Sequence, residues 1–302
     1  MALLLNEESN TIKYLQDSLG DPEFCDVKIV ATDGEVPANK TILSMSSQYF
    51  RSMFSDNNNF VEGQTGVVKM PYTKTVMEKV VFYLYSGQLK YQDLALGCLL
   101  DLMDLLNLTN LHDEFVAVER STMIKIKRSD FSLSDCLKSL DRCSRLGLET
   151  VGEALLTHLG GNFRHFSQDQ AVGTLSGDMI ARLLYEKMEV ESQTIVRFRT
   201  LITWLSFNLE AIMKEELLEL FDFDHFTVEE LATDVRRSGL YDKDRIIERM
   251  EQLHRETRTE MEAKEKMYRE DIGIIKDSSN FNPAIPVNIW TQFVPRSIQD
   301  KY

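Results

Sequence analysis

Histidine and cysteine side chains, which could bind a metal ion or act as nucleophiles, are few and scattered in this 302-residue sequence. Of the five histidines, only His158 and His165 are spaced to share a helix face, and no cysteine or carboxylate completes a metal-ligand set. The stretch "HLGGNF" (158–163) lacks the Lys-Ser/Thr pair of a phosphate-binding loop, and no GxSxG nucleophile motif occurs. We therefore expect a protein that is not an enzyme, with no catalytic residue, no metal and no cofactor.

The four cysteines also lack a recognisable spacing. Cys25 and Cys98 lie far from the others, and Cys136 and Cys143 are seven residues apart in a helical pattern. This spacing gives neither a disulfide framework nor a CxxC metal pair. We expect buried, reduced thiols and a location in the cytoplasm, with the nucleus as a second location.

The charge of the chain excludes several classes of partner. The formal net charge is −14 and the isoelectric point is near 4.9, while the basic stretch "IKIKR" (124–128) is short and flanked by acids. A nucleic-acid site needs a basic stripe to neutralise phosphates. No apolar run approaches the ~20 residues of a membrane span, and "MALLLNEESN" lacks the basic start of a signal peptide. We expect neither nucleic acid nor a membrane as partner.

The elements predicted around these residues are mostly helical. Six prolines and 14 glycines are few for a sheet protein of this length, which is sufficient for two domains. Within residues 25–40, apolar side chains recur at every second position, as Val27, Ile29 and Ala31, and the chain turns at Asp33-Gly34. This pattern predicts a β-hairpin. The remaining expected elements are a strand and helix within 3–19, helices at 40–45 and 47–54 with Ser47 capping the second, a strand at 66–71, and helices at 75–85 and about 92–107.

The most unusual stretch is "SSQYFRSMFSDNNNFVEG" (46–63). Four apolar side chains lie on one edge of its helix, and an Asn-rich loop follows; these residues are Tyr49, Phe50, Met53 and Phe54. The loop should be polar, yet Phe60 and Val61 stand in it just before Glu62. Phe60 either folds back onto the core or is left to be covered by a partner.

The first part of the chain resembles the BTB/POZ domain. The resemblance covers roughly residues 5 to 120 and consists of "CDV", the hairpin, "NKTILSMSSQYFRSMF", a strand, and a helix ending in "YLYSG". Asn39 stands where usual members have a histidine, but the order and spacing of the elements fit. The implied fold is a small mixed sheet with a helical bundle.

The second half is similar to the BACK domain that follows BTB in many adaptors. It contains "MEV" (188–190) as the L-x-V step and Trp204 at the end of a helix, while Ser192-Gln193 replaces the usual Ser-Glu. We predict an α+β, mostly α protein with a BTB/POZ domain at 1–122 and an all-α BACK domain at 129–250. A charged helix and extended tail follow at 251–302. Ile246, Met250 and Leu253 begin an apolar stripe that soon breaks, so a coiled coil is not expected.

The resemblance implies a protein partner for the loop. In BTB adaptors for cullin-3 ubiquitin ligases a hydrophobic-x-Glu motif follows this helix, which identifies Phe60, Val61 and Glu62 as cullin-binding residues. Tyr49 matches a family position near the same surface. The helices between Leu133 and Leu159 resemble the "3-box" that extends the cullin contact, although core packing explains their leucines equally well.

The resemblance also implies a two-fold homodimer. Its predicted interface is the first strand and helix together with a buried charged pair, which gives Leu3, Leu4, Leu5, Ile12, Leu15, Leu19, Asp26 and Lys40. A strand of three leucines would lose its free edge on a symmetric mate. Packing within one chain, and a surface pair of little energy, are the alternatives.

The predicted function is that of an adaptor that joins cullin-3, dimerises and presents an unknown protein substrate for ubiquitin conjugation. The alternative is a BTB-dimer scaffold, or a transcription-associated interaction protein, that binds no cullin. No 40–50-residue period occurs, so we expect no kelch repeats. Substrate binding then falls to the second domain, to the tail or to a further partner.

Overall fold

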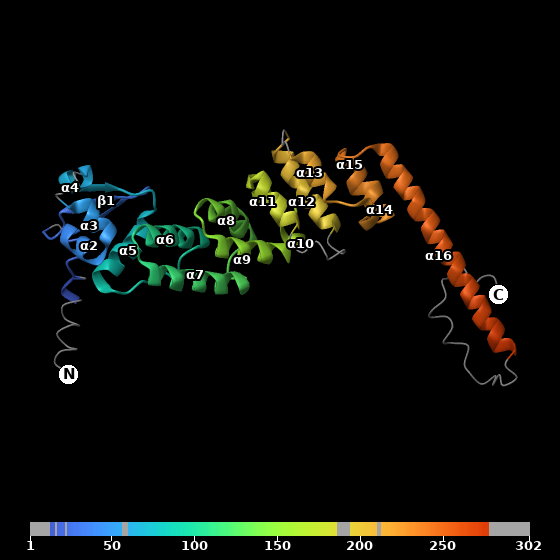
Figure 1. The fold of residues 1–302 in the computed structure, drawn as a ribbon, viewed down its shortest axis with the longest axis horizontal. Helices are drawn as coiled ribbons and strands as arrows, with labels where there is room; N and C mark the ends of the chain where they lie inside the picture. Colours follow the sequence, from blue (N-terminus) through green and yellow to red (C-terminus); the bar gives the residue numbers. More distant parts are fainter. Residues whose placement is uncertain are drawn as a thin grey trace. The chain divides into compact units, whose positions relative to one another are not determined.

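The computed structural model describes residues 13–15, 17–21, 23–55, 60–185, 194–209 and 213–277, with side chains as far as Met267 apart from Asp224. Contacts divide the chain between His225 and Phe226 into two compact units. Figure 1 shows the elements of the first unit from blue to yellow-orange and those of the second in orange to red. Residues 1–12 and 278–302, where a first strand and a tail are predicted, lie outside the described residues.

The first unit begins with a three-stranded sheet in the order β2–β1–β3. Strand β1 (Val27–Val30) pairs antiparallel with β2 (Glu35–Ala38) and parallel with β3 (Val67–Lys69). The register aligns Ile29 with Val36 and with Val68, and all three are buried. The predicted hairpin and third strand are therefore confirmed.

Helices cover this sheet and continue the chain away from it. They are α2 (Lys40–Ser46), α3 (Gln48–Phe54), α4 (Val61–Thr65), α5 (Lys74–Ser86), α6 (Leu96–Leu108) and α7 (His112–Lys127). Helix α5 ends at Gly87, whose φ of 67° is the left-handed conformation that glycine adopts without strain. This end was predicted from the Ser86-Gly87 pair and is confirmed.

The rest of the first unit is helical. Its elements are α8 (Leu133–Arg145), α9 (Glu149–Gly160), α10 (Phe163–Phe166), η2 (Gln170–Thr174), α11 (Gly177–Tyr185), α12 (Thr194–Phe207), α13 (Lys214–Glu219) and η4 (Phe223–His225). Trp204 is buried, and its indole Nε1 donates to the Leu175 carbonyl at 2.8 Å, which joins α12 to the segment before α11. The fold is α+β and mostly α.

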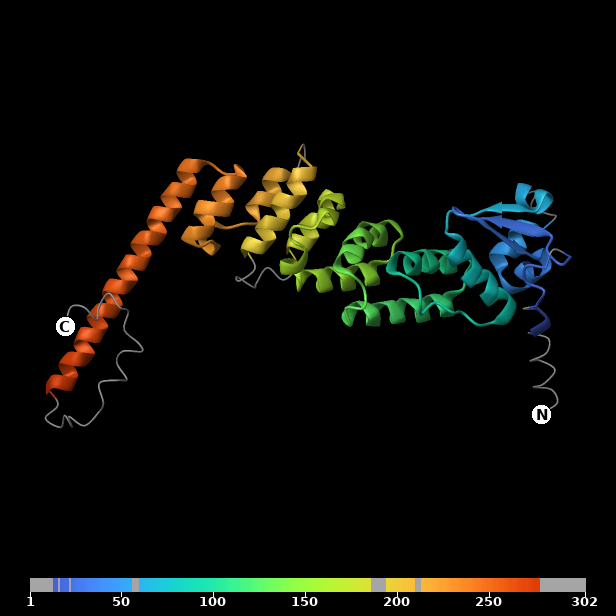
Figure 2. The ribbon, with the colours of Figure 1, turned by 180° about the vertical axis from the view of Figure 1, so that it is seen from behind.

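The predicted start of the BACK domain at 129 lies in a turn inside the first unit. Ser129 has a φ of 61°, and Ser132 caps α8 by accepting from the Asp135 amide at 3.1 Å. Helix α6 packs on α8 and α7 packs on α9, and the two views show these helices lying along one another (Figure 1, Figure 2). Arg142 of α8 forms an ion pair with Asp101 of α6, and Asp101 is buried. The helices before and after the predicted BTB–BACK boundary therefore pack on each other.

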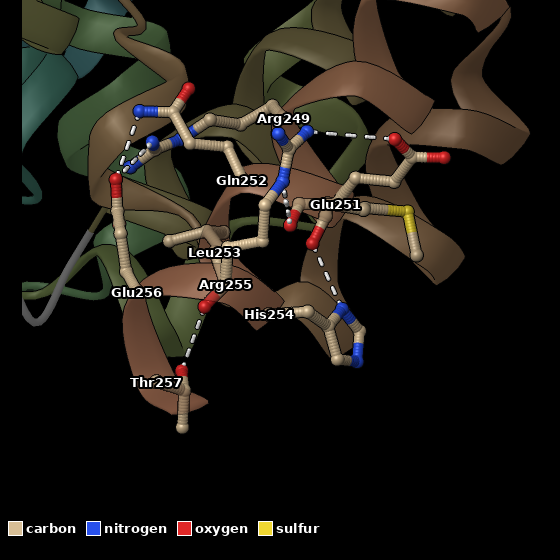
Figure 3. A network of polar contacts seen from close by, with 9 residues as sticks. Arg249, Glu251, Gln252, Leu253, His254, Arg255, Glu256 and Thr257 are labelled. Carbon is tan, nitrogen blue, oxygen red and sulfur yellow. Dashed lines mark hydrogen bonds and ion pairs between the residues drawn. The ribbon is translucent and has the colours of Figure 1, made fainter. Parts of the chain in front are cut away.

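The second unit consists of a bulged helix and a long one. Its elements are α14 (Val228–Glu230), the π-helical η5 (Leu231–Val235), α15 (Arg236–Ser238) and α16 (Lys243–Asp277). Helix α16 packs on η5 and α14 through its first turns, where Ile246 is buried, whereas Met261 and Met267 are exposed. In Figure 3 the polar side chains in its middle bond within the helix, as Gln252 does with Glu256 at 2.9 Å. The apolar stripe that was predicted to begin at Ile246 and soon break thus packs only at the start of the helix.

One predicted cap is wrong. Ser47 precedes α3, but its side chain makes no capping bond. Its hydroxyl instead donates to the Thr109 carbonyl at 3.2 Å, because the end of α6 lies against this position. The cap of the preceding helix α2 is Asn39, whose Oδ1 accepts from the amides of Thr41 and Ile42.

Candidate protein-interaction site

Phe60 stands at the start of α4, in the position just before the first helical residue. Its carbonyl accepts the Gly63 amide at 3.1 Å, which closes the first turn. Phe60 is 49% exposed and the adjacent Val61 is 66% exposed. We call these two residues the α4 patch. The phenyl ring does not fold into the core, so half of its surface is available to a partner.

Tyr49 and Glu62 lie beside the α4 patch. Burial, and then the negative charge of Glu62, raises the pKa of the Tyr49 hydroxyl above its usual value of 10.0. An electrostatic influence of this kind requires that the carboxylate be near the ring. The Tyr49 hydroxyl also faces the Met70 sulfur at 4.0 Å. Tyr49 therefore lies within electrostatic range of Glu62, which directly follows Phe60 and Val61 in the chain.

The other aromatic residues of α3 pack next to Tyr49 and to each other. Phe50 is fully buried, meets Tyr49 edge-on with ring centres 5.2 Å apart, and stacks on Phe54 at 6.0 Å. Phe50 thus belongs to the core, and the Tyr49 ring packs against it.

The predicted dimer residues fall into two groups. Leu15 and Leu19 are half-buried. Leu15 lines a mainly apolar groove of about 600 Å³ together with Tyr14, Phe24 and Ile42. The other apolar members, Leu3, Leu4, Leu5 and Ile12, lie outside the described residues. The described part of the surface offers an apolar groove, and the dimer itself remains a prediction.

Within the single chain Asp26 and Lys40 meet through the Lys40 backbone, and their charged pair in a dimer remains a prediction. Asp26 is exposed, and its Oδ1 accepts the backbone amide of Lys40 at 2.7 Å. The Lys40 ammonium instead donates to the Gly63 carbonyl at 2.8 Å. In the single chain the carboxylate therefore fixes the start of α2, and the ammonium contacts α4.

The helices that resemble the 3-box bury most of their leucines. Leu137, Leu140, Leu155, Leu156 and Leu159 are at most 2% exposed. These side chains form the core between α8 and α9 in the isolated chain. Packing explains them, and a partner surface here would have to be made by other residues.

The remaining chemistry of the described chain is sparse. Cys136 and Cys143 are buried free thiols, and burial raises the pKa of Cys136 to about 11 and of Cys143 to about 12. Within the described ranges no three His, Cys, Asp or Glu side chains gather closely enough to hold a metal ion. No helix in the described part is long and apolar enough to cross a membrane.

Sequence reasoning missed what holds α4 in place. Gly63 and Gly66 allow this short helix to approach its neighbours, and Lys40 connects it to α2. The spacing Gly-x-x-Gly just after the Phe-Val-Glu triplet was the available signal. The acceptor of the Lys40 ammonium is 23 residues away in the chain, and no local pattern in the sequence indicated it.

Comparisons with known proteins agree with this fold. The family model of the BTB/POZ domain matches residues 15–120. Human Kelch-like protein 5 is 26% identical over 213 residues, which is 70% of this chain and 27% of that protein. Mouse gigaxonin is 26% identical over 66% of this chain and 32% of its own length. BTB/POZ domain-containing protein 9 of Drosophila melanogaster is 21% identical over 76% of this chain and 31% of its own length.

The chain thus spans about a third of the length of these curated relatives. Among solved structures, the BTB domain of human gigaxonin aligns with 24% identity and a TM-score of 0.31, over 37% of this chain and 87% of that one. The BTB domain of zebrafish PATZ1 aligns with 19% identity and a TM-score of 0.32, over 38% and 90%.

Proposed function

Because residues 15–120 form a BTB/POZ domain, we propose that this protein is a homodimeric interaction adaptor that brings substrates to a cullin-3 RING ubiquitin ligase. The observation that carries the proposal is the half-exposed Phe60 ring at the start of an ordered helix. An adaptor of this kind acts by binding, without catalysis of its own, and we assign it to the cytoplasm, with the nucleus as a second location.

The α4 patch would supply the anchor of the cullin contact. Burying the exposed half of a phenyl ring and most of a valine contributes roughly 1 kcal/mol each, by the usual value for apolar surface. Aromatic anchors placed in a partner's pocket frequently contribute more than their area suggests. Glu62, beside Tyr49, would accept hydrogen bonds at the edge of the contact.

The apolar groove beside Leu15 supports the proposed dimer. A second copy would cover Tyr14 and Phe24, which are 73% and 55% exposed. Leu3, Leu4, Leu5, Ile12 and Leu19 would complete that interface. Two copies in one assembly hold two substrates and two ligase arms, so that weak substrate contacts gain by avidity. Substrates would bind the proposed BACK domain at 129–250 or the tail.

Titration with an amino-terminal fragment of cullin-3 tests the proposal. We expect Phe60→Ala to weaken binding by about 30-fold, which corresponds to about 2 kcal/mol, and Glu62→Ala by a smaller factor. Tyr185→Ala is the matched control, because Tyr185 is an aromatic residue that is 68% exposed at the end of α11. This variant should bind as the wild type does.

Two outcomes would contradict the adaptor. Equal affinity of wild type and Phe60→Ala would mean that the α4 patch is not the anchor. No measurable binding by the wild type, with a dimer in sedimentation, would favour the scaffold that binds no cullin. The unfolding midpoint of each variant should be measured, so that a loss of fold is not mistaken for a loss of contact.

A further inference from the structure

Lys40 is the first residue of α2, and its side chain lies between Phe54 at the end of α3 and the backbone of α4. Its ammonium donates to the Gly63 carbonyl at 2.8 Å and stands 5.9 Å from the centre of the Phe54 ring. We propose that Lys40 is the positioning residue that holds α4, and thereby sets the direction in which Phe60 and Val61 face a partner. This inference rests on the proposed function of the α4 patch.

Helix α4 depends on contacts with its neighbours to stay in place. It is five residues long, and none of its side chains is buried. A helix this short is not stable by itself in water, so contacts with the surrounding fold must supply its stability. The Val61 side chain points outward, so the backbone of α4 is the part that its neighbours can hold.

Two glycines allow that backbone to approach the fold closely. A Cβ atom at Gly63 would lie 3.1 Å from the Met53 carbonyl of α3. One at Gly66 would lie 2.9 Å from the Asp26 carbonyl, and Gly66 also has a φ of 71°. The Lys40 ammonium is 3.8 Å from the same position at Gly66. Lys40 therefore reaches α4 at the point where the two glycines dock it.

The acceptor on α4 is one that needs an outside donor. The last carbonyls of a helix have no amide partner within the helix, and Gly63 belongs to the last turn of α4. A hydrogen bond from a cation to such a carbonyl is stronger than a neutral one, and it also opposes the negative end of the helix dipole.

Asp26 does not compete for this ammonium. Its Oδ1 accepts the Lys40 backbone amide at 2.7 Å, so the carboxylate serves the start of α2. The Lys40 side chain is half-buried. Its ammonium lies near the Phe54 ring while it donates to the Gly63 carbonyl. The residue that the resemblance implied for the dimer interface thus acts on the α4 patch.

Hydrogen exchange on the free protein tests this directly. Lys40→Met keeps an unbranched side chain of similar length and removes the ammonium. We expect the amides of residues 60–66 to exchange about tenfold faster in this variant, while those of β1 change little. Lys40→Arg, which restores a cation, should return exchange to within about threefold of wild type.

Binding to the cullin-3 fragment provides the second measurement. Lys40→Met should weaken it about fivefold to twentyfold with a sedimentation profile like that of the wild type, and Lys40→Arg should recover most of the loss. Lys28→Met is the matched control, because Lys28 forms an exposed ion pair with Glu35 on the same sheet. It should change neither exchange in α4 nor binding.

Unchanged exchange at residues 60–66 in Lys40→Met would overturn the inference. Faster exchange with undiminished cullin affinity would overturn it as well, because the position of α4 would then have no effect on the binding of the partner. If wild type itself fails to bind the fragment, the proposed function fails, and the exchange measurement alone still decides whether Lys40 holds α4.

Discussion

His158 carries a ring nitrogen, Nε2, that is buried and has no hydrogen-bond partner among the described residues. Burial lowers the pKa of His158 from its ordinary value of 6.5, because a charged imidazolium would lose its hydration. Its spacing to His165 had suggested a shared helix face. In the structure His158 lies on α9 and the exposed His165 lies on α10.

The lowered pKa predicts a specific dependence of stability on pH. Between the folded pKa and 6.5 the unfolded chain binds more protons at His158 than the folded chain does. The free energy of unfolding therefore rises with pH in this window, and falls as the pH drops below 6.5 through the folded pKa. We expect His158→Gln to lose less stability between pH 7.5 and pH 5.5 than wild type does.

Urea unfolding at the two pH values measures this difference. His165→Gln is the matched control, because it removes an exposed histidine from the neighbouring helix. It should follow the wild type, whose carboxylates contribute the same background in all three proteins. Identical pH dependence in wild type and His158→Gln would mean that burial of this ring has no effect on the folding equilibrium.

At the scale of single elements, local patterns predicted what local forces determine. The alternation of residues 25–40 and the turn at Asp33-Gly34 gave the hairpin, because side-chain period and turn chemistry act over a few residues. The predicted cap by Ser47 is wrong because the Ser47 hydroxyl donates instead to the carbonyl of Thr109, which is 62 residues away. The acceptor of the Lys40 ammonium, the Gly63 carbonyl, lies 23 residues away and was not predictable from local patterns for the same reason. The Asp26–Lys40 pair of a dimer remains a prediction.

Asn39 illustrates how a departure from the family pattern can carry a structural role. Its Oδ1 caps α2, its amide Nδ2 donates to the Phe24 carbonyl at 2.8 Å, and its backbone amide donates to the Tyr85 hydroxyl at 2.8 Å. One side chain thus joins the start of α2 to the segment before β1. The sequence marked this position only as a replaced histidine.

Replacing Asn39 should therefore be costly. We expect Asn39→Ala to lower the free energy of unfolding by about 2 kcal/mol, because it removes both the cap and the bond to Phe24. Asn39→Asp keeps an oxygen for the cap and loses the amide donor, so it should cost about half as much. Urea unfolding monitored by circular dichroism compares the two, and an Asp variant less stable than the Ala variant would contradict this assignment of roles.

At the scale of the molecule, the boundary between domains was the least accessible feature. The BACK domain was predicted to begin at 129, and the chain does turn there. What the sequence did not indicate is that Asp101 and Arg142 pair across it, and that α6 packs on α8. Both groups look like ordinary surface charges until the helices are placed together. The BACK boundaries at 129 and 250 remain predictions.

Continuous packing across the turn predicts that residues up to His225 unfold as one cooperative unit. Leu43 in α2 and Trp204 in α12 provide a test, because both are buried and they lie at opposite ends of this unit in sequence. We expect Leu43→Ala to cost about 2–5 kcal/mol, the usual range for a buried leucine. In a cooperative unit, unfolding followed at Trp204 must show the whole of this loss in the free energy of unfolding.

Fluorescence of Trp204, in a Trp290→Phe background that leaves it as the only tryptophan, follows α12 in urea while circular dichroism follows the chain as a whole. The Trp204 transition should shift to a lower midpoint in Leu43→Ala, since two-state unfolding makes every probe within the unit report one equilibrium. If the first unit instead contained two independent domains, the Trp204 transition would stay at its wild-type midpoint while part of the circular dichroism signal is lost at lower urea. That result would restore an energetic boundary at the turn after α7, whereas a shift of the Trp204 transition means that Asp101, Arg142 and the helices around them transmit folding free energy across it.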